Sequence, residues 1–235
     1  MAVGAPKLGT PKPTAGLKAR IVSCSQLLAR QYRNPRHGNK RDPLDELVYA
    51  MLSTRTSDAV YPTVYRSLKK EFPKWDDVDG RRVGTFHRIL APGGLSALKA
   101  YQLLGIFWAL RRDFGRVTLA SLRAMADDDA ERYLMALPGV GKKVAKCVLM
   151  YSLDRRVLPV DVHTHRVAAR LGLKAKRRPD TSQDLIEAQV PPELRYGFHV
   201  NAVAHGRAVC LPRKPLCGVC VLRQYCPYGK KQNKK

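Results

Sequence analysis

Residues 137–149 read LPGVGKKVAKCVL, and this stretch decides the fold. The segments on either side of the turn, residues 130–136 and 142–153, have the apolar spacing of helices. The five residues LPGVG between them are too few to form anything except a tight connection. The stretch therefore predicts a helix-hairpin-helix over residues 130–153.

The glycines of this turn create a candidate anion site. Gly139 and Gly141 lack a Cβ, so the backbone can take unusual conformations and another chain can approach its amides closely. Backed by the positive end of the following helix, these amides suit a phosphate group of DNA, and we expect Gly139, Val140 and Gly141 to contact it. The alternative is an ordinary helix–helix turn with a glycine C-cap, and the positive charge of the chain favours phosphate binding.

The lysines that follow the turn differ in their expected surroundings. On a helical projection Lys143 borders an apolar face, whereas Lys142 and Lys146 lie on the flank away from it. That face consists of Val144, Cys147, Val148 and Tyr151. Because Lys143 lies at a helix N-terminus beside two other cations, we expect its pKa to be lowered, as a nucleophilic amine requires. A second phosphate-binding lysine is the alternative for Lys143, and for Lys146 we expect contact with DNA.

The charge of the whole chain indicates a polyanionic partner. The 235 residues include 43 Lys and Arg against 19 Asp and Glu, a formal net charge of +24. This excess is far larger than solubility requires and is typical of proteins that bind nucleic acid, although a generally basic proteome would also produce it. No run of about 18 apolar residues occurs, which argues against a membrane span.

The ends of the chain are expected to be basic tails. Residues 1–17 contain no acidic residue, no signal-peptide core and no amphipathic period, so we expect a disordered tail rather than a transit peptide. Residues 229–235 form a second basic tail. Without a secretory signal, the six cysteines are better candidates for metal ligands than for disulfides.

Four of these cysteines form a cluster near the C-terminus. Cys210, Cys217, Cys220 and Cys226 are separated by six, two and five residues. Four thiolates in so short a loop indicate a metal centre, and their spacing is compatible with both tetrahedral zinc and a 4Fe-4S cluster. We expect Cys24 and Cys147, which lie outside the pattern, to be small buried apolar residues.

The rest of the chain also has helical periodicity. No sustained alternating pattern of a strand occurs, so we expect an all-α fold of many short helices in two subdomains. The remaining expected helices lie within residues 19–33, 43–58, 59–72, 96–114, 119–125, 127–137, 164–173, 182–190 and 191–210. The HxH pair of His163 and His165 has no evident third ligand, so we expect structural hydrogen bonds there rather than a metal.

Together with VDVHTHRVAARLGL at residues 160–173, the hairpin and the cysteine loop resemble the endonuclease III family of DNA base-excision glycosylases. The resemblance runs from about residue 20 to residue 228. It implies a helix-hairpin-helix glycosylase fold, with a six-helix barrel domain over residues 43–155 and a discontinuous iron-sulfur cluster domain over residues 18–42 and 156–228. It also implies a 4Fe-4S cluster rather than zinc.

The resemblance also implies the site residues. LPGVGKKVA is similar to the family's LPGVGRKTA, which places the Schiff-base lysine at Lys143, and the aspartate of the family's VDTH falls on Asp161. LSTRTSD is similar to the segment that fills the gap left by an extruded base, with Arg55 where the family typically has Gln. GGLSALKA is similar to the DNA-wedging loop, with Leu95 as the wedge. A second departure is Val162, where the family has Thr.

The function implied is that of a bifunctional DNA glycosylase and AP lyase. It would act as a monomer on double-stranded DNA with damaged bases or abasic sites, removing oxidised pyrimidines and nicking the strand by β-elimination. Asp161 would assist Lys143, while Arg213 and Lys214 of the cysteine loop would touch phosphates unless they are merely a solvated basic surface. The expected compartment is the bacterial cytoplasm with its nucleoid, with an organelle or a nucleus as alternatives.

Three other functions are compatible with parts of the pattern. A monofunctional mismatch glycosylase would not need a lysine at position 143. A DNA-binding scaffold of the same fold, with weak or altered lesion activity, is left open by Arg55 and Val162. A zinc-dependent nucleic-acid binder is compatible with the cysteine spacing alone.

Overall fold

The computed structural model describes residues 16–93 and 96–232, which are helical and contain no strand in those ranges. The all-α prediction is therefore confirmed. Most of residues 1–17 and Leu95 lie outside the described residues. No helix in the described ranges is long and apolar enough to cross a membrane.

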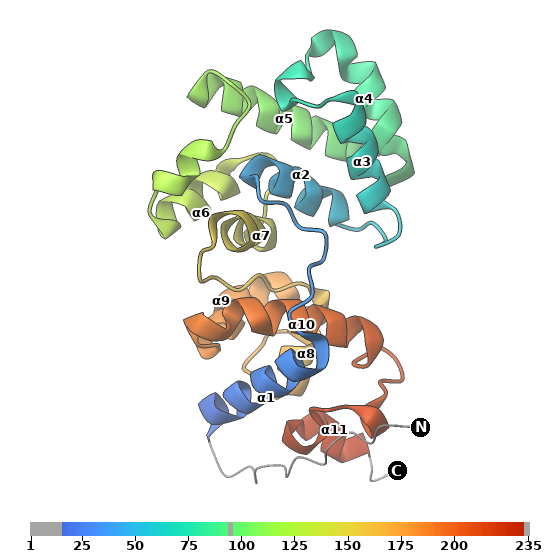
Figure 1. Ribbon diagram of the computed structural model, residues 1–235, viewed down its shortest axis with the longest axis vertical. Helices are drawn as coiled ribbons and strands as arrows, with labels where there is room; N and C mark the ends of the chain where they lie inside the picture. The colour runs from blue at the N-terminus through green and yellow to red at the C-terminus, as the bar shows by residue number, and fades with distance from the viewer. Residues whose placement is uncertain (1–15, 94–95, 233–235) are drawn as a thin grey trace, which may run out of the picture.

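The molecule consists of two halves stacked along its long axis (Figure 1). One half contains α2–α7, and the other contains α1 and α8–α11. The helices of the first half are α2 (Pro43–Ser53), α3 (Tyr61–Glu71), α4 (Val83–Leu90), α5 (Ser96–Phe114), α6 (Asp127–Ala136) and α7 (Lys142–Leu153). Those of the second half are α1 (Leu17–Tyr32), α8 (Val162–Arg170), α9 (Pro179–Gln189), α10 (Arg195–Ala208) and α11 (Pro227–Lys231).

Each half has its own hydrophobic core. Buried residues from Leu44 to Val157 form one core, while Ile21, Cys24 and Leu28 join buried residues from Leu158 onward to form the other. Helix α1 thus belongs to the second half, the following helices α2–α7 form the first half, and α8–α11 belong to the second half again. We propose that the domain limits follow this division, with residues 43–155 as one domain and residues 18–42 and 156–228 as the other.

Local sequence explains where the key helices begin. Asp42 caps α2 by accepting hydrogen bonds from the amides of Leu44 and Asp45, and Pro43 occupies the first helical position, where its missing N–H costs nothing. Asp161 caps α8 in the same way, by accepting from the Thr164 amide at 2.7 Å. The latter cap fixes the backbone at a residue that the sequence singled out for chemistry.

Several expected helix limits differ from the structure. Helix α2 ends at Ser53 rather than near residue 58, because Arg55 takes a left-handed φ of 54° that no α-helix accommodates. Helix α11 extends into the expected C-terminal tail as far as Lys231, since Pro227 begins it and the Cys226 sulfur accepts from the Gly229 amide at 3.3 Å. Helix α4 was not expected, and it buries Phe86 and Leu90 against the first core.

Candidate functional site

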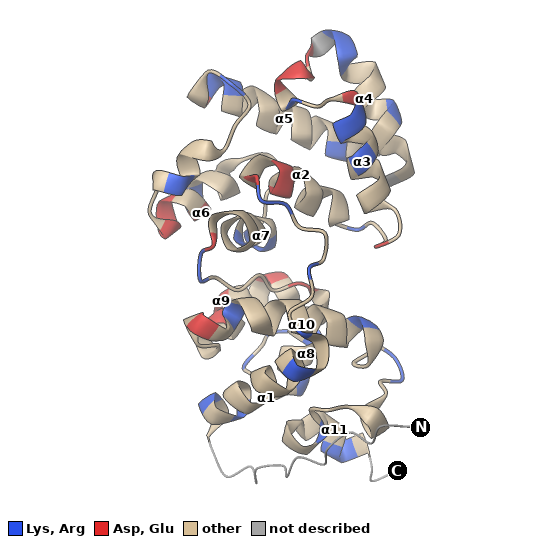
Figure 2. Cartoon of the chain, in the orientation of Figure 1, with Lys and Arg blue, Asp and Glu red and all other residues tan. Residues whose placement is uncertain are grey.

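A cleft of about 1130 Å³ lies between the two halves. Five of the predicted site residues line it, namely Arg55, Gly139, Gly141, Lys143 and Asp161. Its lining also contains more cations than carboxylates: Arg55, Lys99, Lys142, Lys143, Arg178 and Arg207 against Asp58, Asp161 and Asp180. An excess of positive charge in a concave site attracts a polyanion. Figure 2 shows Lys and Arg residues on both halves, so the positive charge is not confined to one of them.

The predicted helix-hairpin-helix is confirmed as α6, a turn over residues 137–141 and α7. Gly139 has a left-handed φ of 73°, and Gly141 is the N-cap residue of α7. Both glycines are exposed, whereas the Val140 side chain is buried in the first core with 6% of its surface exposed. The turn therefore presents its two glycines to a ligand at the positive end of a helix, whereas the Val140 amide already donates to the Leu137 carbonyl at 3.2 Å.

The two glycines predict different responses to substitution. A Cβ at Gly139 would collide with the Gln102 side-chain amide and would sit at a positive φ, so Gly139→Ala is expected to lower the unfolding free energy by about 1–2 kcal/mol. Gly141→Ala is the matched control, because no atom lies within 4 Å of a Cβ built there and its φ is −94°. Urea unfolding of both variants checks this expectation. Equal stability of the two variants would contradict it.

Lys143 is half-buried at the start of α7, and its pKa is raised rather than lowered. Burial is the largest influence and lowers the pKa, but the negative charges of Cys147, Asp161 and Glu46 raise it and together outweigh burial. Burial raises the pKa of the Cys147 thiol to about 12 and that of the Glu46 carboxyl to about 7, so Asp161, whose pKa is lowered, is the neighbour that stays ionised near neutral pH. The expectation of a lowered Lys143 pKa is therefore wrong for the free protein.

That expectation failed because the neighbouring lysines have partners of their own. Lys142 forms an ion pair with Asp184, and Lys146 lies between Glu131 and Glu187. Their charges are neutralised by carboxylates that the sequence places 15 to 42 residues away. Lys142 and Lys146 are close to Lys143 in sequence, but because they are paired they repel its positive charge less than the sequence suggested.

Asp161 lines the same cleft as Lys143, and it stays ionised because its pKa is lowered. Burial is the largest influence on its pKa and raises it, but His199, the Thr164 amide and Lys143 lower it, and the net shift is downward. The Thr164 amide bond also fixes the orientation of the carboxylate. Since Val162 is 59% exposed and takes no part in this cap, the hydroxyl that the family carries there is not needed to orient Asp161.

Arg55 is exposed at the mouth of the cleft, on the turn that follows α2. This turn is held by a lysine that the sequence did not single out. Lys99 of α5 is only 4% exposed and donates to the Leu52 carbonyl at 3.0 Å and to the Thr56 hydroxyl. Burial lowers the pKa of Lys99. In the sequence, the only indication of this role is that Lys99 lies among apolar residues of the expected 96–114 helix. That position does not identify its partner Thr56, which is 43 residues away.

Lys146 does not reach the cleft or the surface, so the prediction that it contacts DNA is wrong. Its side chain is 7% exposed and forms ion pairs with Glu131 and Glu187. The flank of α7 that the projection assigned to solvent packs against α6 and α9. A helix surrounded by others buries residues all round, which the one-sided pattern of its apolar residues did not indicate.

Arg213 and Lys214 are exposed on the cysteine loop and do not line the cleft. His163 and His165, the HxH pair, both form hydrogen bonds. His163 bonds to Arg166 at 3.0 Å, and His165 bonds to the Lys176 carbonyl at 2.9 Å. Cys24 and Cys147 are buried, as expected.

The four cysteines of the loop line the wall of one cavity. Nitrogen donors lie close to three of their sulfurs: Arg170 is 3.2 Å from Cys210, the Gly229 amide 3.3 Å from Cys226, and His205 3.4 Å from Cys220. Such N–H groups stabilise thiolate ligands. No three metal-ligating side chains within the described ranges gather closely enough for a single ion. Four sulfurs around one cavity are suited to a bound metal centre.

Comparisons with known proteins agree with this geometry. Residues 210–226 match the iron-sulfur binding domain of endonuclease III. Endonuclease III of Thermotoga maritima is 27% identical over 202 residues, which cover 86% of this chain and 91% of the relative. The structure matches a non-covalent endonuclease III–DNA complex at 25% identity, with a TM-score of 0.76 over 93% of this chain and 99% of that one.

A trapped endonuclease III–DNA covalent intermediate, with an estranged adenine, matches equally well. Its identity is 25% and its TM-score 0.76, over 92% of this chain and 98% of that chain. These matches confirm the helix-hairpin-helix glycosylase fold with its cluster loop. The match over residues 210–226 also confirms the predicted 4Fe-4S cluster.

Proposed function

The chain belongs to the endonuclease III family of DNA glycosylases, and from this premise we propose that it is a bifunctional glycosylase and AP lyase. It binds damaged duplex DNA, removes oxidised pyrimidines and nicks the strand by β-elimination. The observation that carries the proposal is the pairing of Lys143 with Asp161 in one cleft, where each shifts the pKa of the other. We place the protein with the DNA of a bacterial nucleoid, acting as a monomer.

The reaction begins with extrusion of the damaged nucleotide. A base inside the stack cannot be attacked at its sugar, so the nucleotide rotates into the cleft. Arg55 at the cleft mouth and Leu95 occupy the space that it leaves. Gly139 and Gly141 hold the DNA backbone with their amides, and Arg213 and Lys214 bind phosphates farther along the strand.

Lys143 is the nucleophile and Asp161 its acidic partner. The Lys143 ammonium first loses its proton, and its lone pair then forms a bond to the sugar C1′ as the base departs. The Asp161 carboxylate assists the proton transfer and stabilises the positive charge that develops on the sugar. The departing base takes up a proton, the C1′–O4′ bond then opens with protonation of O4′, and the nitrogen forms a protonated imine with C1′. This imine allows a proton to leave C2′ and the 3′ phosphate to depart, which nicks the strand.

The cysteine residues hold the 4Fe-4S cluster, which supplies a redox-capable centre and fixes the loop when it is bound. Cys210, Cys217, Cys220 and Cys226 are its ligands. Because Arg213 and Lys214 lie between the first two ligands, the cluster loop orders the two cations that we assign to phosphate binding.

The raised pKa of Lys143 predicts how the rate depends on pH. Below that pKa the neutral fraction of the amine rises about tenfold per pH unit, while Asp161, whose pKa is lowered, stays ionised. Single-turnover nicking of an abasic duplex is therefore expected to increase from pH 6 to pH 8.5, with no acidic optimum. Saturating protein at constant ionic strength separates this effect from DNA binding. A rate that is flat or falls over this range would contradict the protonation state assigned to Lys143.

Borohydride trapping tests the proposed function. The purified protein is mixed with duplexes that carry an oxidised pyrimidine, an abasic site or no damage. Covalent adducts on the first two and none on the third are the expected result. An adduct on the abasic duplex alone would leave a lyase without this glycosylase specificity. Tight binding without any adduct would overturn the catalytic assignment and leave a DNA-binding scaffold.

A further inference from the structure

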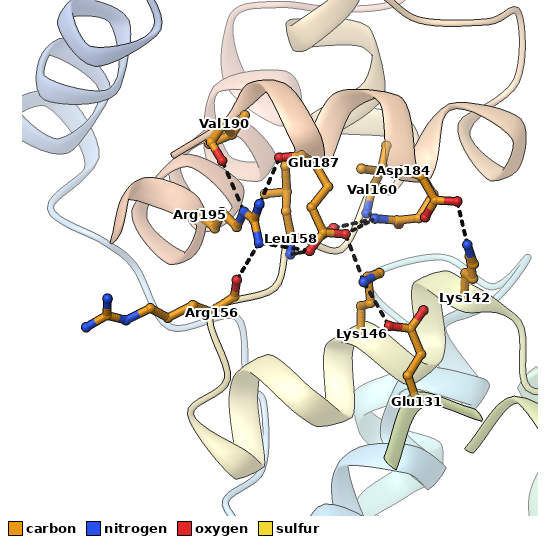
Figure 3. Close-up of polar contacts among 11 residues, drawn as sticks. Glu131, Lys142, Lys146, Arg156, Leu158, Val160, Asp184, Glu187, Val190 and Arg195 are labelled. Atoms are coloured by element: carbon orange, nitrogen blue, oxygen red, sulfur yellow. Dashed lines mark hydrogen bonds and ion pairs between the residues drawn. The ribbon is translucent and has the colours of Figure 1, made fainter. Parts of the chain in front are cut away.

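The buried lysine of the hairpin joins the two halves of the molecule (Figure 3). Lys146 Nζ of α7 lies 2.9 Å from a carboxylate oxygen of Glu131 on α6 and 2.8 Å from one of Glu187 on α9. Helices α6 and α7 belong to the first half, and α9 belongs to the second. The ion pair with Glu187 therefore crosses between the halves, whereas the pair with Glu131 stays within one.

Glu187 accepts hydrogen bonds from four donors. One oxygen receives the Leu158 amide at 3.1 Å and Arg195 at 3.3 Å. The other oxygen receives Lys146 at 2.8 Å and the Gln183 amide at 3.3 Å. Only an ionised carboxylate can accept on both sides, because the isosteric amide of glutamine would turn an NH₂ group toward two of these donors.

Gln183 bonds both to Glu187 and to the segment that precedes Asp161. Its oxygen accepts from the Val160 amide at 2.9 Å, and its nitrogen donates to the Leu158 carbonyl at 2.6 Å. Residues 158–160 are thus bound on both edges by α9 side chains, and the next residue is Asp161. Lys143 precedes Lys146 by three residues, about one helical turn, on α7.

We propose that Lys146, Glu187 and Gln183 are positioning residues that hold the Asp161 segment at a fixed place relative to Lys143. The chain of contacts runs from α7 through Lys146 to Glu187 and Gln183, and from these to residues 158–160. This inference rests on the proposed function, in which Lys143 and Asp161 act together. Small misplacements of such groups reduce rate strongly even when binding is unchanged.

The energetics favour a role in placement over a role in stability. Burying a charged lysine with two carboxylates costs desolvation energy that often equals or exceeds the attraction, so apolar residues of similar volume would stabilise the fold as well. Lys146 nevertheless keeps its charge, because Glu187 and Glu131 raise its pKa more than burial lowers it. What an apolar replacement cannot supply is the directional set of hydrogen bonds that ends at residues 158–160.

The test compares two carboxylates on the same lysine. Glu187→Gln breaks the link between the halves, and Glu131→Gln, the matched control, alters the pair within one half. For Glu187→Gln we expect single-turnover nicking of an abasic duplex to fall about tenfold with a DNA dissociation constant within twofold of wild type. We also expect the Leu158 amide, which donates to Glu187, to exchange hydrogen about tenfold faster. Glu131→Gln should leave both quantities within twofold.

Equal effects of the two variants, or no effect of either on rate and exchange, would overturn the positioning role. Should Glu187→Gln fail to fold, Gln183→Leu removes the other two contacts with residues 158–160, at the Val160 amide and the Leu158 carbonyl, without leaving a buried charge unpaired. Faster exchange of the Val160 amide is then the expected result. Amide hydrogen exchange does not depend on catalytic activity. A failure of the proposed function can therefore be distinguished from a failure of the positioning inference. A wild-type protein that nicks nothing refutes the proposed function, and unaltered exchange in Glu187→Gln refutes the positioning inference.

Discussion

Lys143→Ala is expected to abolish the borohydride-trapped adduct and to reduce nicking of an abasic duplex by about 10⁴-fold, the scale on which enzymes lose activity with their nucleophile. The reason is chemical, because the other amines near Lys143 are engaged elsewhere. Lys99 also lines the cleft, but it is 4% exposed and donates to the Leu52 carbonyl and the Thr56 hydroxyl. Lys142 and Lys146 are held in ion pairs with Asp184, Glu131 and Glu187. Denaturing electrophoresis of the trapped complex and single-turnover kinetics measure the two losses.

Lys142→Ala is the matched control for this variant. Lys142 is adjacent in sequence, lines the same cleft and carries the same charge, but it pairs with Asp184 at the surface. Its removal is expected to weaken DNA binding slightly and to leave the adduct intact. An adduct that survives Lys143→Ala and disappears in Lys142→Ala would transfer the nucleophile to the neighbouring residue and refute the assignment.

Asp161→Asn is expected to reduce glycosylase turnover by about 10²- to 10³-fold while leaving the fold intact. Asparagine is as good an N-cap residue as aspartate, so the bond from the Thr164 amide persists and only the negative charge is lost. Without that charge, nothing at position 161 accepts the proton or stabilises the cationic sugar. Excision of an oxidised pyrimidine under single-turnover conditions gives the size of the loss.

The same substitution is expected to move the pH profile. Asp161 is one of the groups that raise the pKa of Lys143, so its removal lowers that pKa and increases the neutral amine at a given pH. The residual activity of Asp161→Asn should therefore level off at lower pH than that of the wild type. Asp161→Ala, which also loses the α8 cap, separates the cap from the charge through its greater loss of stability. A rate within threefold of wild type in Asp161→Asn would remove Asp161 from the mechanism.

The sequence predicted the features that depend on neighbours along the chain. The apolar spacing around LPGVG located α6 and α7, and the glycines located a turn with exposed amides. The spacing of four cysteines located the cluster loop. Each of these follows from backbone geometry or ligand chemistry within a few residues, which a sequence displays directly.

The tertiary structure decided the charges and partners of the lysines. From the sequence we expected a lowered pKa for Lys143, but Asp161 and Glu46 lie near it in the fold and raise its pKa. We expected Lys146 at the surface, but it is buried between α6 and α9, where it pairs with Glu131 and Glu187. The role of Lys99 depended on a turn 43 residues away. Electrostatic energy depends on distance and burial in space rather than on separation along the chain, so the protonation state and placement of a side chain are fixed only when the helices pack.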